Sequence, residues 1–269
     1  MPVPDAAPDS GPDAAADLAL LLEAAAKAAP IALHHWKSDP QVWQKDDGAG
    51  PVSEGDLAVN AALETHLRTA RPAYGWLSEE SEDDPARQTA RRTFVIDPID
   101  GTRSYLDGQT NWAISIAVVE AGQPIAAAIA MPAKSNTYAA ATGQGATLNG
   151  TPIQATPRPT LAGATVLTPR ITLEPANWPG GVPDIDRHFR PSLAYRMALV
   201  AQGRFDAMIT LRDAWEWDIA AGALIVAEAG AQVSDHTGAP LVFNSAGAKT
   251  PGVVAGVDGV WRGLLAGLK

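Results

Sequence analysis

The sequence predicts an α+β fold in which helices cover an antiparallel sheet in the first half of the chain. Two segments with apolar side chains at helical spacing come first, at residues 17–36 and 56–71. Residues 114–118 then alternate between branched apolar and small or polar side chains, which is typical of a half-buried strand. Further strands, separated by glycine-containing turns that favour hairpins, are predicted at residues 125–131, 137–141 and 146–148.

The second half of the chain mixes helices and short strands. Helices are predicted at residues 193–202 and 218–228, with Asp218 as the N-cap of the second, and residues 253–257 and 261–268 close the chain. Strands are predicted at residues 164–167, 207–211 and 241–243 and around Val233. We therefore divide the chain into a disordered tail at 1–13, an N-terminal α+β domain at 14–150 and a C-terminal α/β domain at 151–269.

The composition excludes several classes of partner. The formal net charge of −10 argues against binding to a nucleic-acid polymer or to an anionic membrane surface. No apolar run approaches the roughly 20 residues that cross a bilayer, and the N-terminal segment lacks the basic and apolar regions of a secretory signal. The chain contains no cysteine, which excludes disulfides and cysteine-ligated metal centres. We predict a cytoplasmic protein.

The segment Asp97-Pro98-Ile99-Asp100-Gly101-Thr102 concentrates more reactive groups than any other part of the chain. Residues 94–96 before it are predicted to end a buried strand, which places Asp97 at the carboxyl edge of a sheet. Pro98 lacks a backbone donor and disfavours helical geometry at Asp97. Asp100 is expected to be the N-cap of the following helix or turn. The two carboxylates would then face one cavity, where their repulsion favours a cation between them.

Further carboxylates come from Glu79-Glu80 upstream and from Asp218 downstream. Mg²⁺ takes oxygen ligands and is usually held by a few carboxylates together with substrate phosphate. An alternative interpretation makes the aspartates of the 97–102 segment a local turn and the two glutamates a solvated loop edge. The joint presence of the three acidic segments favours a polynuclear magnesium site over that alternative.

Four segments together resemble the signatures of the inositol monophosphatase superfamily. They are Pro51-Val52-Ser53-Glu54-Gly55-Asp56, Ser78-Glu79-Glu80-Ser81, the 97–102 segment and Trp217-Asp218-Ile219-Ala220-Ala221-Gly222. Their order and spacing fit this family over nearly the whole chain. The resemblance implies Mg²⁺-dependent, Li⁺-sensitive phosphomonoesterase activity and commonly a homodimer. It also implies a layered αβαβα sandwich, with an antiparallel sheet in the N-terminal half and a mixed sheet in the C-terminal half.

The resemblance assigns metal ligands to individual residues. Two or three Mg²⁺ ions are expected, with Mn²⁺ as an alternative ion and Li⁺ as an inhibitor. Glu79, Asp97 and the Ile99 carbonyl resemble the ligands of the first ion. Asp97, Asp100 and Asp218 resemble those of the second ion, so that Asp97 bridges the two. Glu80 would lie near a third ion.

The resemblance also assigns roles around the substrate. Thr102 and Glu79 resemble the pair that orients and deprotonates the attacking water, and Asp56 would hold Thr102 in place. The amides of Gly101 and Thr102 resemble a phosphate cradle at a helix start, where the helix dipole favours an anion. Further candidates for substrate contact are Lys45, Ser192, Arg212 and Asp218.

The predicted function is hydrolysis of a small phosphorylated metabolite by metal-activated water. Position 211 is Leu, where inositol-selective members of the family usually carry Glu, and Arg190-Pro191-Ser192 replaces their Gly-Thr/Ser. The 51–56 loop and the residues before Asp218 look closer to bacterial 3′(2′),5′-bisphosphate nucleotidases. Inositol monophosphate and adenosine 3′,5′-bisphosphate therefore both stay open as substrates, with histidinol phosphate and sugar phosphates behind them.

Two classes without catalysis are the alternatives. A regulatory protein that binds metal and phosphate would need neither the Thr102 hydroxyl nor the Glu79 base, and both residues are present. A dimer that is merely stabilised by metal would lose thermal stability on chelation, while phosphate release would stay at background.

Overall fold

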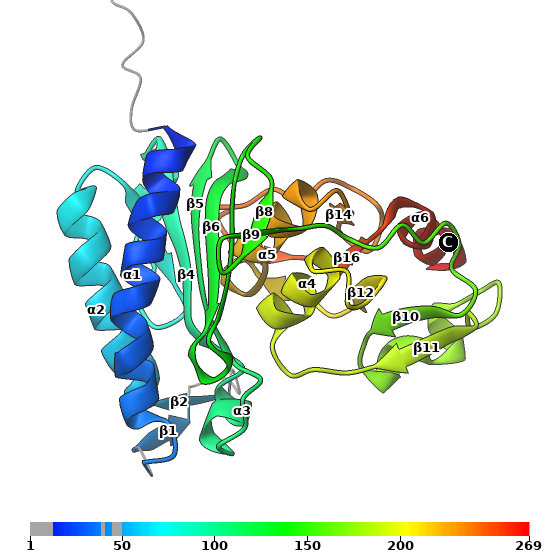
Figure 1. The fold of residues 1–269 in the computed structure, drawn as a ribbon, viewed down its shortest axis with the longest axis horizontal. Helices are drawn as coiled ribbons and strands as arrows, with labels where there is room; N and C mark the ends of the chain where they lie inside the picture. The colour runs from blue at the N-terminus through cyan, green and yellow to red at the C-terminus, as the bar shows by residue number, and fades with distance from the viewer. Residues whose placement is uncertain (1–12, 39–40, 45–49, 269) are drawn as a thin grey trace, which may run out of the picture.

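The chain folds into a layered αβαβα sandwich, as the sequence predicts. The structure is a computed structural model that describes residues 13–38, 41–44 and 50–268. Figure 1 shows α1 and α2 on one face of a large sheet, and α4 and α5 between that sheet and a second one. Three apolar clusters fill the spaces between successive layers, with α6 covering the outer face of the second sheet.

The outer helical layer consists of α1 (Ala14–His35) and α2 (Glu54–Ala70). In α2 the predicted apolar face is confirmed, because Val59, Leu63 and Leu67 are all buried. This helix begins two residues before the predicted start at Asp56, since Ser53 is its N-cap and accepts from the Asp56 amide. The buried face of α1 is built largely of alanine, so this helix can lie close to the sheet.

The first sheet has seven strands in the order β3-β4-β5-β6-β7-β8-β9. Its strands are β3 (Gly75–Ser78), β4 (Arg92–Asp100), β5 (Ala113–Glu120), β6 (Gln123–Met131), β7 (Asn136–Ala141), β8 (Ala146–Leu148) and β9 (Thr151–Ile153). All neighbours are antiparallel except β3 and β4, which are parallel and joined through the 3₁₀ helix η2 (Pro85–Thr89). The prediction that 114–118 is half-buried is wrong, because helices cover both faces of β5.

The second sheet is mixed, as predicted, with the order β11-β10-β12-β16-β14. Its strands are β10 (Ala164–Leu167), β11 (Ile185–His188), β12 (Ala207–Thr210), β14 (Gln232–Ser234) and β16 (Val253–Gly256). The predicted strand at 241–243 is not formed. The backbone there bonds instead to the turn between β5 and β6, where Phe243 N donates to Gly122 O and Gln123 Nε2 donates to Leu241 O.

The inner helices are α4 (Leu193–Ala201) and α5 (Glu216–Glu228). They approach closely at Gly222, where an added Cβ would lie 2.6 Å from Met197 Sδ. Almost every residue of α5 is buried, because this helix lies between two sheets. None of the described helices has the length and apolar character needed to cross a membrane.

Shorter elements complete the fold. They are α3 (Thr102–Leu106), α6 (Asp258–Leu268), the pair β1 (Val42–Gln44) and β2 (Pro51–Ser53), the pair β13 (Ala214–Trp215) and β15 (Lys249–Thr250), and the 3₁₀ helices η3 (Pro132–Lys134), η4 (Arg170–Leu173) and η5 (Pro175–Asn177). The predicted tail lies outside the described residues except for Asp13, the N-cap of α1. Because β9 pairs with β8 of the first sheet, the chain passes from one sheet to the other after residue 153. The division into two domains stays a prediction.

Candidate active site

A cluster of carboxylates lies at the edge where β3 and β4 end. The two strands are parallel, with Ser78 opposite Ile96, so Glu79, which follows β3, lies beside Asp97, which is still paired with Ser115 within β4. The Glu79 amide donates to Ile96 O at 3.2 Å, which holds the two chains together at this point. Single carboxylate oxygens of Glu79, Asp97 and Asp218 lie within 4.8 Å of one another. This spacing allows the three side chains to share one cation.

Asp218 reaches this edge from α5. The prediction that Asp218 is the N-cap of α5 is wrong, because the helix begins at Glu216 with Trp215 as its N-cap. Asp218 is therefore the third helical residue. The first turn is held against the sheet by Ser115, whose hydroxyl donates to Trp217 O at 3.0 Å. Since Ser115 lies opposite Asp97 across β4 and β5, this bond brings the two aspartates together.

Asp100 does not cap the helix that follows it, contrary to the prediction. The N-cap of α3 is Gly101, with a φ of 98° that favours glycine. A break in the β4–β5 pairing between Asp97 and Asp100 turns the Asp100 carboxylate toward α4 instead. There it accepts from Ser192 Oγ and from the Ala194 amide, both at 2.6 Å. Asp100 thus supports the start of a helix from another part of the chain.

Burial and like charge dominate the electrostatics of the cluster. Burial, together with the charges of Glu79, Asp100 and Asp218, raises the pKa of Asp97 well above its usual range. Burial and the charges of Asp100 and Glu79 also raise the pKa of Asp218. Burial raises the pKa of Asp100 to about 6, although the bonds from Ser192 and Ala194 oppose this shift. A bound cation would relieve the repulsion in all three cases.

Two arginines provide nearby positive charge. Arg196 of α4 is almost fully buried, and its guanidinium donates to Arg190 O and Pro191 O. Burial lowers the pKa of Arg196 to about 10, against the opposing effect of Asp100. Arg212 is exposed, and its charge acts to lower the pKa of Asp218. The positive charges of these two side chains offset part of the negative charge of the carboxylate cluster.

Thr102, predicted to orient the water together with Glu79, contacts Asp56 and the Ile99 carbonyl. The Thr102 hydroxyl is 3.3 Å from Asp56 Oδ1 and 3.2 Å from Ile99 O. Asp56 is itself fixed, because its other oxygen accepts from the Ser53 amide at 2.8 Å and from the Ser53 hydroxyl. The structure therefore places Asp56 where it can hold Thr102, and places the Ile99 carbonyl next to the same hydroxyl.

The other predicted substrate contacts differ in their surroundings. Ser192 is fully buried, donating to Asp100 and accepting from the Tyr195 amide at 2.9 Å. Its hydroxyl is therefore used within the fold at the N-cap of α4. Gly101 lies close to the chain after α3, since an added Cβ would come within 3.1 Å of Asn111 O. Lys45 lies outside the described residues.

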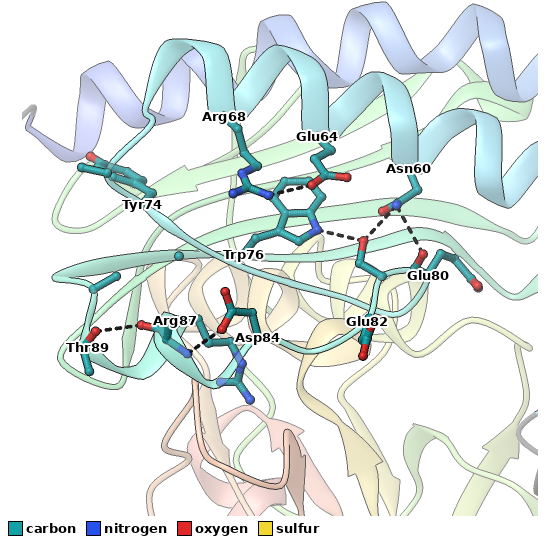
Figure 2. Close-up of a pocket in the computed structure, with 15 residues that line it drawn as sticks. Asn60, Glu64, Arg68, Tyr74, Trp76, Glu80, Glu82, Asp84, Arg87 and Thr89 are labelled. Atoms are coloured by element: carbon teal, nitrogen blue, oxygen red, sulfur yellow. Dashed lines mark hydrogen bonds and ion pairs between the residues drawn. The ribbon is translucent and has the colours of Figure 1, made fainter.

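Glu80 is one of the residues that line a neighbouring cavity. Figure 2 shows this cavity between α2, which contributes Asn60, Glu64 and Arg68, and the segment around η2, which contributes Asp84 and Arg87. The cavity has a volume of about 640 Å³, and Glu79, Asp97 and Asp218 do not line it. We place the candidate active site at the three carboxylates, because their oxygens converge and because the pKa values of Asp97 and Asp218 are raised.

Sequence reasoning missed the residues that support the site. Ser115 gives no signal, because its partner Trp217 is 102 residues away in the chain. The second supporting residue is Arg196 of α4. An arginine on the buried α4 is the signal that could have indicated a countercharge for the aspartates.

Convergent carboxylates beside a positioned hydroxyl define a site of the metal-assisted hydrolase class. The chain belongs to the inositol monophosphatase family, whose model matches residues 14–266. It is 34% identical to an inositol-1-monophosphatase of Rhizobium meliloti over 197 residues, or 70% of this chain and 73% of the relative. It is also 34% identical to a 3′-phosphoadenosine 5′-phosphate phosphatase of Mycobacterium leprae over 208 residues, or 71% of this chain and 72% of that one.

The similarity extends to solved structures. The crystal structure of the extragenic suppressor protein suhB from Bartonella henselae superposes with a TM-score of 0.81 at 29% identity. The match covers 94% of this chain and 98% of that one. The fold is therefore that of the family. Members of this family are generally metal-dependent, and this chain is a phosphoric monoester hydrolase.

Proposed function

We propose that this protein is a Mg²⁺-dependent phosphomonoesterase that hydrolyses a small phosphorylated metabolite by direct attack of water. The convergence of Glu79, Asp97 and Asp218 oxygens within 4.8 Å carries the proposal. Their burial raises the electrostatic cost of the ionised cluster, and a divalent cation would lower that cost. The donor set consists of oxygens without sulfur or nitrogen, which suits Mg²⁺.

The roles of the ligands follow from their positions. We assign Asp97 as the bridge between two ions, because it is almost fully buried and the charges of Glu79, Asp100 and Asp218 all act on it. Glu79 and the Ile99 carbonyl would complete one site, Asp100 and Asp218 the other, and Glu80 would contact a third, more exposed ion. Bound Mg²⁺ would lower the pKa of a coordinated water and neutralise charge on the phosphoryl oxygens.

The chain itself supplies the proton acceptor and the orientation of the water. Thr102 is held by Asp56 at 3.3 Å, so its hydroxyl has a defined position next to the cluster. We assign Glu79 as the base that takes the proton of the attacking water and Thr102 as the group that orients it. The amides that follow Gly101 would bind the phosphate, and Lys45, Arg212 and Asp218 would contact the phosphate or the leaving group.

The surroundings of Asp218 bear on the leaving group. Leu211 packs against the core of the second sheet, so this position offers no carboxylate for inositol hydroxyls. Trp215 and Trp217 stack on each other at 4.6 Å and 11°, with Lys249 Nζ 3.9 Å from the Trp215 ring. This arrangement supports a packing role for the two indole rings. Inositol monophosphate and adenosine 3′,5′-bisphosphate both remain candidate substrates, ahead of histidinol phosphate and sugar phosphates.

A substrate panel tests the proposal. Phosphate release is measured with inositol 1-phosphate, adenosine 3′,5′-bisphosphate, fructose 1,6-bisphosphate and histidinol phosphate, each with Mg²⁺ and with chelator. We expect Mg²⁺-dependent turnover of at least one compound and inhibition by Li⁺. Equal rates with chelator would contradict the metal-dependent mechanism. Background rates throughout, with a chelation-sensitive melting temperature, would favour a structural or regulatory metal site. Sedimentation and fractionation would test the proposed homodimer and cytoplasmic location.

A further inference from the structure

A chain of buried polar contacts joins η2, which follows Glu79 in the chain, to the first turn of α5, which carries Asp218. It begins at Glu216, the first residue of α5, which is fully buried and lies two positions before Asp218. The Glu216 carboxylate accepts from the Asn244 amide at 2.5 Å and from the Ser245 amide at 3.0 Å. Its third donor is the Ser245 hydroxyl. The loop at 244–245 is therefore bound tightly to the first turn of α5.

The same loop is bound on its other side by Arg87 of η2. This guanidinium donates to Asn244 Oδ1 at 2.6 Å and to Ser245 O at 2.9 Å. It is almost fully buried and also forms a two-point ion pair with Asp83, at 2.6 and 3.0 Å. Figure 2 shows Arg87 where η2 passes below the cavity beside Glu80.

Neighbouring contacts keep η2 close to the strands that carry the acids. Thr93 of β4 donates its hydroxyl to Arg87 O at 3.2 Å. A Cβ added at Gly75 of β3 would lie 2.9 Å from Arg87 Cα, so only glycine permits this approach. These contacts fix η2 against the starts of β3 and β4, while the Glu79 amide is bound to Ile96 O, so the segment between Glu79 and η2 is held at both of its ends.

We propose that Arg87, Asn244 and Glu216 are positioning residues that set the separation of Glu79 and Asp218, and through it the affinity for the cation. Glu79 directly follows β3, six residues before η2 begins, and Asp218 lies in the first turn of α5. These segments belong to different layers, and the contacts through 244–245 tie them together beside the site. The inference rests on the proposed function, because it assumes that these acids bind a divalent cation.

Substitution of Arg87 changes the Mg²⁺ affinity in opposite directions for a positioning role and for a purely electrostatic role. Removing a positive charge near the acids would by itself strengthen Mg²⁺ binding. Loss of positioning would weaken it, by about tenfold as for other residues that orient metal ligands. Glu216 is less informative, since its own negative charge lies near Asp218. Asn244→Gly is a neutral second variant, because glycine keeps the φ of 61° while the contact with Arg87 is lost.

The control is Arg92, a second buried arginine at the opposite end of β4. It bonds to Asp17 and Glu120, far along the strand from the acidic cluster. Arg92→Gln is expected to lower the melting temperature and leave Mg²⁺ affinity unchanged. This control reports how far general loss of stability affects the binding measurement.

The experiment is calorimetric titration of each full-length variant with Mg²⁺ alone. We expect weaker binding for Arg87→Gln and Asn244→Gly than for the wild type and for Arg92→Gln. Unchanged or tighter binding by Asn244→Gly and by any Arg87→Gln that folds would overturn the positioning role, as would an equal loss in Arg92→Gln. Absence of Mg²⁺ binding by the wild type would instead overturn the proposed function, and this inference with it.

Discussion

Buried charges are paired with opposite charges at one end of β4 and clustered with like charges at the other. At its start, Arg92 donates to Asp17 at 2.8 Å and to Glu120 at 3.0 Å, so a buried cation meets two anions. At its other end, Asp97 and Asp100 are buried beside further carboxylates of the same sign. Burial of charge is costly unless opposite charges meet. The ion pairs at the first end therefore stabilise the fold. At the second end, the burial of like charges destabilises the fold, and a bound cation would remove this destabilisation.

The pKa values at the two ends move in opposite directions. Burial would raise the pKa of Glu120, but the hydrogen bonds from Arg91 and Arg92 outweigh it and hold this pKa below its usual range. Burial and like charge raise the pKa of Asp97. Ionised Glu120 therefore stabilises the fold above its unfolded pKa. Ionisation of Asp97 destabilises the fold as the pH rises, until metal binds.

The largest predicted effect is at Asp97. Asp97→Asn should lower kcat/KM by at least ~10³-fold, because it removes the bridging ligand and the charge that holds the metals. The same change should raise the melting temperature of the chelated protein, because it removes one buried like charge. Steady-state phosphate release and calorimetric melting measure the two effects. Turnover close to that of the wild type would contradict our assignment of the site.

The opposite end of β4 should respond in stability alone. Arg92→Gln breaks a buried ion pair and should lower the free energy of unfolding by about 3 kcal/mol. For a chain of this size the melting temperature should fall by about 6–12 °C. The kcat/KM, measured well below the melting temperature, should match the wild type. A large loss of kcat/KM in a folded Arg92→Gln protein would show that the two ends are coupled.

A smaller catalytic effect is expected at Thr102. Thr102→Ala removes the hydroxyl between Asp56 and Ile99 O, and should lower kcat by about 10²-fold. The Mg²⁺ affinity should be little changed, since the carboxylates remain. Thr102→Ser keeps the hydroxyl and is the matched control, which should retain most of the rate. If both variants lost the rate equally, packing of the threonine methyl group would explain the result better than orientation of water.

The smallest effect is the pH dependence of stability at Asp100. Its folded pKa of about 6 exceeds the usual 3.8, so the folded protein binds this proton more tightly than the unfolded chain does. The stability that results is present below the unfolded pKa and is lost as the pH rises through about 6. With chelator, Asp100→Asn should therefore gain melting temperature relative to wild type between about pH 4 and about pH 7. A difference that is constant or shrinks with pH would contradict this assignment.

Local sequence patterns predicted the parts of the site that lie within one segment. The buried face of α2 follows from neighbouring residues and is confirmed by the fold, whereas the predicted strand end before Asp97 is wrong, because Asp97 still pairs with Ser115 and β4 continues to Asp100. The partner of Asp100 could not be predicted in this way. Its carboxylate accepts from Ser192 and Ala194, more than 90 residues away, because the β4–β5 pairing breaks just before it.

Contacts between layers were the main source of error. The half-buried pattern of 114–118 indicates one covered face, yet α5 covers the other face as well. Aspartate is a common N-cap residue, which favoured Asp218 at the start of the helix. α5 begins two residues earlier, at Glu216, because the Glu216 side chain accepts hydrogen bonds from the 244–245 loop. A pattern within one segment contains no information about such distant partners.

The central claim is that the acidic end of β4 holds a divalent cation. The most direct test is calorimetric titration of the substrate-free protein with Mg²⁺, comparing the wild type with Asp97→Asn. We predict saturable binding of one or more ions to the wild type, and loss of most of that binding in the folded variant. No binding to the wild type, or equal binding to both proteins, would contradict the claim.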